Sequence, residues 1–157
     1  VSHGARSVRT DRPRYRLEFD WTGTHDPTPF LCLPEAIRFL GALLPGGWPE
    51  LMARNAALAR EARRRLAARL DLPPPCPEEM LGSMASLRLP DSRHPLHPVW
   101  ITDELQNELY RRHRIETVVA PWPAHPSRWL RVSAAAYNRI EQFELLAEAV
   151  GALLAEY

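Results

Sequence analysis

The stretch Met84-Ala85-Ser86-Leu87-Arg88-Leu89 decides the fold class. Along it, Met84, Ser86 and Arg88 alternate with the apolar residues Ala85, Leu87 and Leu89. Alternation with a period of two predicts a β-strand. Two further strands are predicted at residues 115–120 and 129–133. A helix at 103–113 precedes them, and an amphipathic helix begins near residue 138. The order strand, helix, strand, strand, helix predicts an α+β fold: a short sheet with helices packed on one side.

Ahead of this layer the sequence predicts two helices. Apolar residues recur at helical spacing from residue 34 to 44 and again from residue 48 to 70, with proline and glycine clusters after each run. Residues 1–31 are rich in arginine and are predicted to be irregular, apart from a possible brief strand at Tyr15–Phe19. A loop of this length is usually functional or packed against another part of a protein.

Local signals predict the helix ends and the charged faces. Thr102 is expected to cap the helix that follows it. Asn138 and Glu141 have the spacing of a capping box. The run Arg63-Arg64-Arg65 is expected to form a solvated helix face with glutamate partners.

Composition limits the classes of function. The net charge of +1 in 157 residues gives no general attraction to nucleic acid or to acidic membranes, and the arginine runs lack interleaved aromatic residues. No membrane span and no signal peptide are expected, since no run of eighteen apolar residues occurs. The two cysteines, Cys32 and Cys76, lack metal-site or disulfide spacing, which favours a reducing cytoplasm.

Few side chains suggest chemistry on their own. His94 and His97 have an H-x-x-H spacing, but the prolines that follow each exclude a regular helix, and no third ligand is evident, so no metal site is predicted. Cys32 has no implied basic partner that would make it a nucleophile. Arg131, on a predicted strand, could bind an anion or simply form a surface ion pair. The sequence Thr22-Gly23-Thr24 could bind a ligand, but it is also typical of an ordinary turn.

Four segments carry a resemblance to a known family, and together they span nearly the whole chain. The chain resembles the class V, fold-type I enzymes that depend on pyridoxal phosphate (PLP), in the branch that includes isopenicillin N epimerase. The segments are Ser2-His3-Gly4 with Glu18-Phe19-Asp20-Trp21-Thr22-Gly23-Thr24-His25-Asp26-Pro27-Thr28, then Pro34–Phe39 leading into Gly46–Met52, then Glu79–Met84, and last Trp129–Ser133 with Tyr137, Asn138 and Glu141.

The resemblance implies two binding roles. Gly23 and Thr24 stand where the family's glycine and threonine reach across a dimer to the partner subunit's PLP phosphate, a role that suits close backbone approach and a hydroxyl donor. Arg131 stands where the family's small-domain arginine binds the substrate carboxylate, for which a planar guanidinium is well shaped. Tyr137 is expected to serve packing, and Asn138 capping.

The resemblance also implies how the chain is divided. Residues 1–31 correspond to the tail of the PLP-binding large domain, at the cofactor and dimer interface. Residues 32–72 are linking helices, and residues 73–157 form the small C-terminal α+β domain. The implied partners are an amino-acid substrate, a second subunit bound through the N-terminal segment, and the missing large domain.

One residue type is missing: all twenty of the Lys+Arg residues are arginine. The chain therefore has no catalytic residue of its own in this chemistry, because the family binds PLP covalently through a lysine. We expect that lysine upstream of Val1, in which case this chain is the C-terminal part of an epimerase, aminotransferase or C–S lyase and is inactive by itself. The alternative is a non-catalytic dimerisation or interaction domain derived from the same fold.

Overall fold

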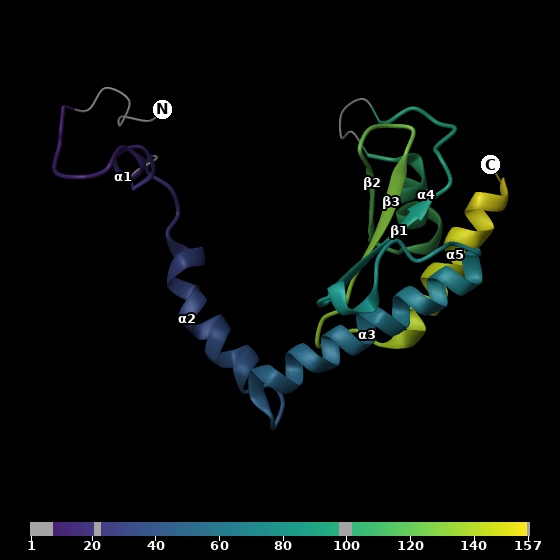
Figure 1. The fold of residues 1–157 in the computed structure, drawn as a ribbon, viewed down its shortest axis with the longest axis horizontal. Coiled ribbons are helices and arrows are strands. Elements are labelled where there is room, and N and C mark those ends of the chain that lie inside the picture. The colour runs from purple at the N-terminus through teal and green to yellow at the C-terminus, as the bar shows by residue number, and fades with distance from the viewer. Residues whose placement is uncertain (1–7, 21–22, 98–101, 157) are drawn as a thin grey trace. The chain divides into compact units, whose positions relative to one another are not determined.

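The computed structural model describes residues 8–20, 23–97 and 102–156 of the chain. Figure 1 shows its elements, which fall into two compact units, Val1–Leu40 and Gly41–Tyr157. The predicted boundaries near residues 31 and 72 stay a prediction.

The first unit contains two helices, α1 (Arg14–Phe19) and most of α2 (Thr28–Gly41). The brief strand predicted at Tyr15–Phe19 is wrong, because interactions four residues apart favour a helical turn there. Arg14 pairs with Glu18, and the rings of Tyr15 and Phe19 lie 5.1 Å apart.

Helix α2 begins six residues earlier than the predicted start at Pro34. The Asp26 carboxylate accepts a hydrogen bond from the Thr28 backbone N–H at 3.0 Å, so an acidic side chain satisfies a donor that the helix itself leaves open. Pro34 lies inside the helix. Its ring removes one backbone donor, a loss that this helix tolerates.

The second unit confirms the predicted α+β fold. A long helix is followed by one strand, a helix, two strands and a last helix, in the predicted order. Their bounds are α3 (Gly47–Leu70), η2 (Glu78–Met80, a 3₁₀ turn), β1 (Met84–Leu89), α4 (Glu104–His113), β2 (Val118–Pro121), β3 (Arg128–Ser133) and α5 (Ile140–Glu156).

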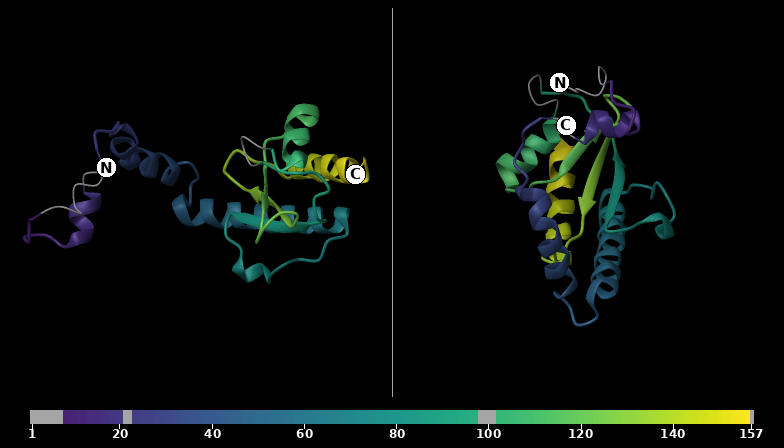
Figure 2. Two further views of the ribbon diagram at one scale, coloured as in Figure 1. Left: turned by 90° about the horizontal axis from the view of Figure 1, so that it is seen from above. Right: turned by 90° about the vertical axis from the view of Figure 1, so that its left-hand side faces the viewer.

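The three strands form an antiparallel sheet in the order β1-β3-β2, with β3 at the centre. One face is buried: Leu87 lies opposite Leu130, and Ala85 opposite Val132. Helices α3 and α5 pack together and cover this face, as Figures 1 and 2 show, and α4 packs against α5 and β2. The predicted one-sided helical layer is therefore confirmed.

A buried ion pair joins the sheet to helix α4. The Arg128 guanidinium donates to the Asp103 carboxylate at 2.8 Å and to the Pro90 carbonyl at 2.8 Å. The Asp103 and Arg128 side chains are only 1% and 4% exposed. Asp103 also caps α4, since its carboxylate accepts from the Leu105 N–H. The predicted cap, Thr102, instead donates to the Asn107 side chain.

Two other local expectations are wrong, because other hydrogen-bond partners are used. Arg63 is buried rather than solvated, and its guanidinium donates to the Cys76 carbonyl at 2.7 Å. At the start of α5, Gln142 takes the place expected for Glu141, since its amide oxygen accepts from the Arg139 N–H at 3.0 Å.

Replacing Arg128 with Met should lower the free energy of unfolding by about 3–5 kcal/mol, because it leaves the buried Asp103 carboxylate without its cation. Chemical denaturation followed by circular dichroism measures this change. Arg88→Met is the matched control: Arg88 is an exposed arginine of β1, and its loss should cost about 0.5 kcal/mol or less. Equal effects of the two variants would contradict the role given to the pair.

Candidate functional site

The uncovered face of the sheet carries Arg131. In β3 the residues alternate, so Trp129, Arg131 and Ser133 face away from the helices that cover Leu130 and Val132. Arg131 lines a groove of about 640 Å³ that runs from the end of α4 past β2 and β3 to the start of α5. The groove also contains Glu116, Tyr137 and Leu145.

The backbone around Arg131 is fixed while its guanidinium is not engaged. Arg131 lies opposite Ser86 on one side and Val118 on the other, and its carbonyl accepts from the Thr117 hydroxyl at 2.8 Å. Within the described part of the chain, its guanidinium has no ion pair or hydrogen bond. Most other arginines of this unit are paired, so Arg131 offers a charged, planar donor to a ligand.

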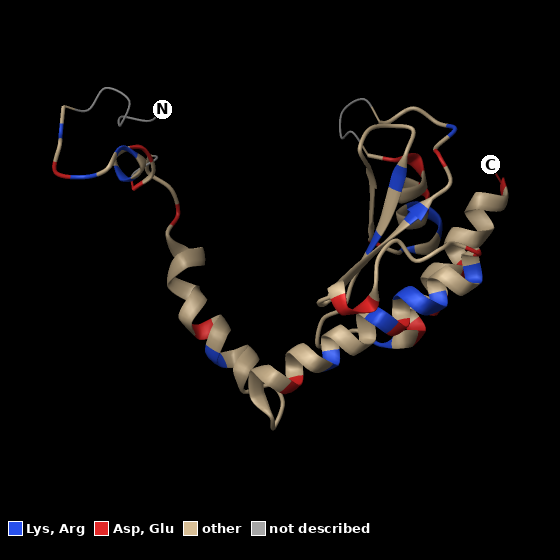
Figure 3. Ribbon diagram, viewed as in Figure 1, with Lys and Arg blue, Asp and Glu red and all other residues tan. Residues whose placement is uncertain are grey.

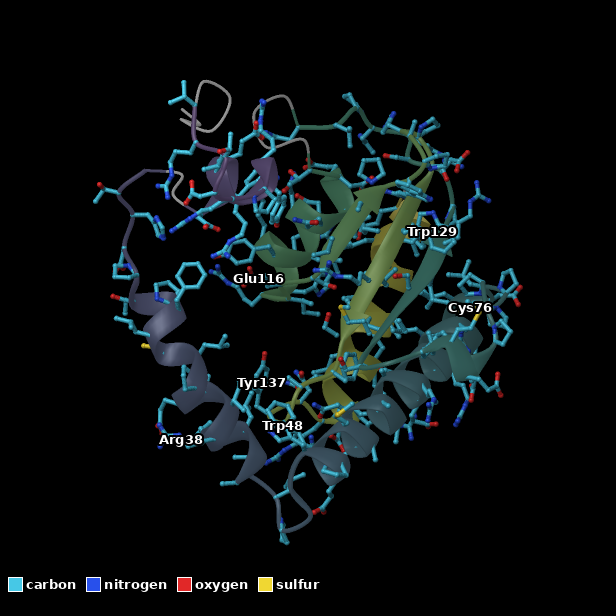
Figure 4. All side chains as sticks on the ribbon, turned by 60° about the vertical axis from the view of Figure 1, so that its left-hand side comes forward. Arg38, Trp48, Cys76, Glu116, Trp129 and Tyr137 are labelled. Carbon is cyan, nitrogen blue, oxygen red and sulfur yellow. The ribbon has the colours of Figure 1, made fainter. Side chains whose placement is uncertain are left out.

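Tyr137 lies on the turn between β3 and α5, and its side chain lines the same groove. The packing role expected for it is wrong, because the residue is 82% exposed. The capping role expected for Asn138 holds in a different form: its side-chain oxygen accepts from the Ala135 N–H at 2.9 Å. Figure 4 shows Tyr137 and Glu116 on the same side of the second unit, away from Cys76.

Gly23 and Thr24 form a bend before α2, in the first unit. Gly23 has a φ of +123°, which side-chain-bearing residues rarely adopt, and nothing lies within 4 Å of the position a Cβ would take. The backbone angle, not crowding, therefore requires glycine here. Thr24 is exposed, and its hydroxyl has no hydrogen-bond partner among the described residues.

The chain that follows this bend is ordered by Asp26. Its carboxylate accepts from the Thr28 hydroxyl at 2.6 Å as well as from the Thr28 N–H. These hydrogen bonds to the charged form, the hydroxyl one first, lower the pKa of Asp26 below its usual value. His25 adds a contact between its Nδ1 and the Gly23 carbonyl at 3.1 Å. The bend thus has a defined local structure.

The three predicted binding residues fall in different units: Gly23 and Thr24 belong to the first and Arg131 to the second. Five residues of the resembling segments lie outside the described residues: Ser2, His3, Gly4, Trp21 and Thr22.

Other candidate sites give no cluster. In residues 8–20, 23–97 and 102–156, no three His, Cys, Asp or Glu side chains are grouped as metal ligands. Cys32 and Cys76 are both free thiols. None of the described helices combines the length and the apolarity that a membrane span requires.

Charges along α3 are mixed rather than of one sign, as Figure 3 shows. Arg64 bonds to Glu61 and Glu78, and Arg65 bonds to Glu61 and Glu144. The expected solvated face with glutamate partners is correct for these two arginines. Their charge is neutralised locally by carboxylates.

Comparison with known proteins identifies relatives of this chain. The chain is similar to isopenicillin N epimerases. It is 40% identical over 144 residues to isopenicillin N epimerase of Streptomyces clavuligerus, and 38% identical over 143 residues to that of Amycolatopsis lactamdurans. Each match covers 90% of this chain but 32% of the relative, so the chain spans about a third of the length of these curated relatives. No protein-family model matches the chain.

The sequence predicted a binding role for Arg131 and packing for Tyr137, and both residues line the same groove. A signal was available: Tyr137 follows Ala134-Ala135-Ala136 and precedes a helix, so no strand or helix face was there to bury its ring. An aromatic residue in such a loop is a better candidate for a ligand contact than for packing.

Proposed function

We propose that this chain is the C-terminal region of a PLP-dependent class V aminotransferase-like enzyme, of the epimerase kind, acting on an amino acid. The observation that carries the proposal is the unengaged guanidinium of Arg131, which lines a groove between the end of α4, β2, β3 and the start of α5. The similarity to two isopenicillin N epimerases supports an epimerase-like region. An aminotransferase or a C–S lyase would use the same groove.

Arg131 would hold the substrate carboxylate. Its planar fork can donate two parallel hydrogen bonds to a carboxylate. The hydrogen bond from the Thr117 hydroxyl to the Arg131 carbonyl helps to fix the backbone of β3 at this position. Less backbone conformational entropy is therefore lost when a ligand binds.

The residues present fit PLP in part. Gly23 lies in a bend and has no side chain, so an anion could approach its backbone closely. The Thr24 hydroxyl next to it has no partner among the described residues and could donate a hydrogen bond to a phosphate group. No residue can hold PLP covalently, because the chain has no lysine. The lysine and the partner of the pyridine ring would come from a large domain outside these 157 residues. When bound, PLP acts as an electron sink that stabilises the carbanion left by loss of the substrate's α-proton.

We place this enzyme in the cytoplasm as a homodimer, with the first unit at the subunit interface. The N-terminal segment would then bring Thr24 to the phosphate of PLP in the partner subunit. No nucleic acid or membrane partner is proposed, which accords with a net charge of +1.

In the complete enzyme, Arg131→Ala should raise KM for the amino-acid substrate by about ten- to a hundredfold, because charge-assisted hydrogen bonds to the carboxylate are lost. The amount of PLP bound per subunit should not change. Steady-state kinetics and the visible absorbance of PLP measure the two quantities. The control is Arg88→Ala, since Arg88 shares the open face but is paired with Asp91 at 3.0 Å. Loss of PLP with an unchanged KM would overturn the assignment.

Thr24→Ala should have the opposite pattern: PLP dissociates about tenfold more readily, while KM for the amino acid changes little. Retention of PLP after dialysis is the measurement. Thr28→Ala provides the comparison, because the Thr28 hydroxyl is already bonded to Asp26. If Thr24→Ala and the native enzyme retain PLP equally, the phosphate role of Thr24 is wrong.

A second candidate function, a non-catalytic dimerisation or interaction domain, is favoured by the surface of α2. None of its residues is buried. Five large apolar side chains, Phe30, Leu31, Leu33, Ile37 and Phe39, are each at least 50% exposed. Exposed apolar surface of this kind marks an interaction site.

An interaction domain should be a defined dimer in solution that unfolds cooperatively, and Ile37→Glu should convert it to monomer at the same concentration. Sedimentation velocity and thermal unfolding test both points. Arg38→Gln is the control on the same helix, since Arg38 is exposed and pairs with Glu35. Polydisperse aggregates that bind a hydrophobic dye would instead favour the enzyme region, whose apolar surface is normally covered.

A further inference from the structure

We propose that Tyr137 determines which carboxylates the Arg131 groove accepts, by packing its ring against an apolar or aromatic body attached to the bound carboxylate. The proposal rests on the carboxylate-binding role of Arg131 and adds the class of ligand. It stands on the exposure of Tyr137, on the way its turn is held, and on the apolar wall beside it.

Tyr137 is the most exposed of the aromatic residues described in this unit. Large rings normally lose water when they pack, yet Tyr137 is 82% exposed. Within the described part of the chain, its phenol has no hydrogen bond. Its contribution to the stability of this unit is therefore small, and the ring is accessible to a ligand.

The turn that carries Tyr137 is held from both sides. The Arg54 guanidinium, from α3, donates to the carbonyls of Ala135 and Asn138 at 3.4 and 3.3 Å. Asn138 donates its backbone N–H to the Ala135 carbonyl at 3.0 Å, and its side chain accepts from the Ala135 N–H at 2.9 Å. The backbone on both sides of Tyr137 is thus fixed while its side chain stays free. Such preorganisation lowers the entropy cost of binding.

The rest of the groove suits a ligand with two different ends. Arg131 provides the cationic end. The other charged or titratable residues that line the groove are Arg114, His113 and Glu116, so basic side chains outnumber carboxylates there. Tyr137 and Leu145, which is 60% exposed, provide apolar surface in the same groove. A carboxylate whose body is apolar or aromatic matches this lining better than a small polar carboxylate does.

Two probes separate the carboxylate from the body: acetate and phenylacetate. NMR titration of the 157-residue chain, observing the Arg131 Nε–H and the Tyr137 ring, gives both affinities. We expect phenylacetate to bind about two- to tenfold more tightly than acetate, because a contact between two aromatic rings adds binding free energy of this size. Tyr137→Ala should remove this preference and leave acetate binding unchanged, whereas Tyr137→Phe should keep it.

Two further variants serve as controls. Tyr110→Ala removes another exposed tyrosine, which lines an adjoining depression beside α4 but not the Arg131 groove itself, and it should leave the preference intact. Arg54→Met frees the turn, so it should weaken phenylacetate binding without affecting acetate. Because Tyr137 is exposed, its variants should fold as the native chain does.

The outcomes distinguish the two proposals. If Arg131→Ala does not weaken acetate binding, the carboxylate role of Arg131 fails, and with it the proposed function. If Arg131→Ala abolishes acetate binding but Tyr137→Ala keeps the phenylacetate preference, the role of Tyr137 alone is overturned. Loss of the preference in Tyr110→Ala would also overturn it.

Discussion

The alternation of side chains along the central strand β3 is the constraint on which the second unit depends. Because β3 pairs on both edges, its register fixes the two flanking strands, and because α3 and α5 cover only one face, every second residue is buried. Arg128 and Arg131 show the consequence within one strand. Their separation of three places them on opposite faces, so one is a buried structural cation and the other is open to a ligand.

The same constraint explains where polar groups are satisfied. On the covered face, Arg128 must be paired, and Asp103 meets that need while capping α4. On the open face, Arg131 is solvated and requires no partner. A charge that folding does not need is available for binding, and the neighbouring turn, held by Arg54, presents Tyr137 beside it. Structure and proposed function thus use separate arginines.

Sequence patterns predicted the elements better than their ends. The strand at Met84–Leu89 and the long helix to Leu70 follow directly from periodicity. The start of α2, the cap of α4 and the burial of Arg63 did not, because each depends on one hydrogen bond: Asp26 to Thr28, Asp103 to Leu105, and Arg63 to the Cys76 carbonyl. Tyr15–Phe19 has a pattern that fits a strand and a helix equally, and only the contacts four residues apart favour the helix.

The sequence by itself determined the α+β order, the position of Arg131 on a strand, the requirement for an external lysine in PLP chemistry, and the resemblance that makes Gly23 and Thr24 candidates. The element order and the strand position of Arg131 follow from residue spacing, which is a local property, whereas the lysine requirement and the roles of Gly23 and Thr24 are implied by the resemblance. Only the tertiary structure decided that Arg131 faces the open side of the sheet, that Arg63 and Arg128 are buried, and that Tyr137 is exposed in the groove. Those outcomes depend on which helix covers which face, and side chains distant in sequence fix that choice.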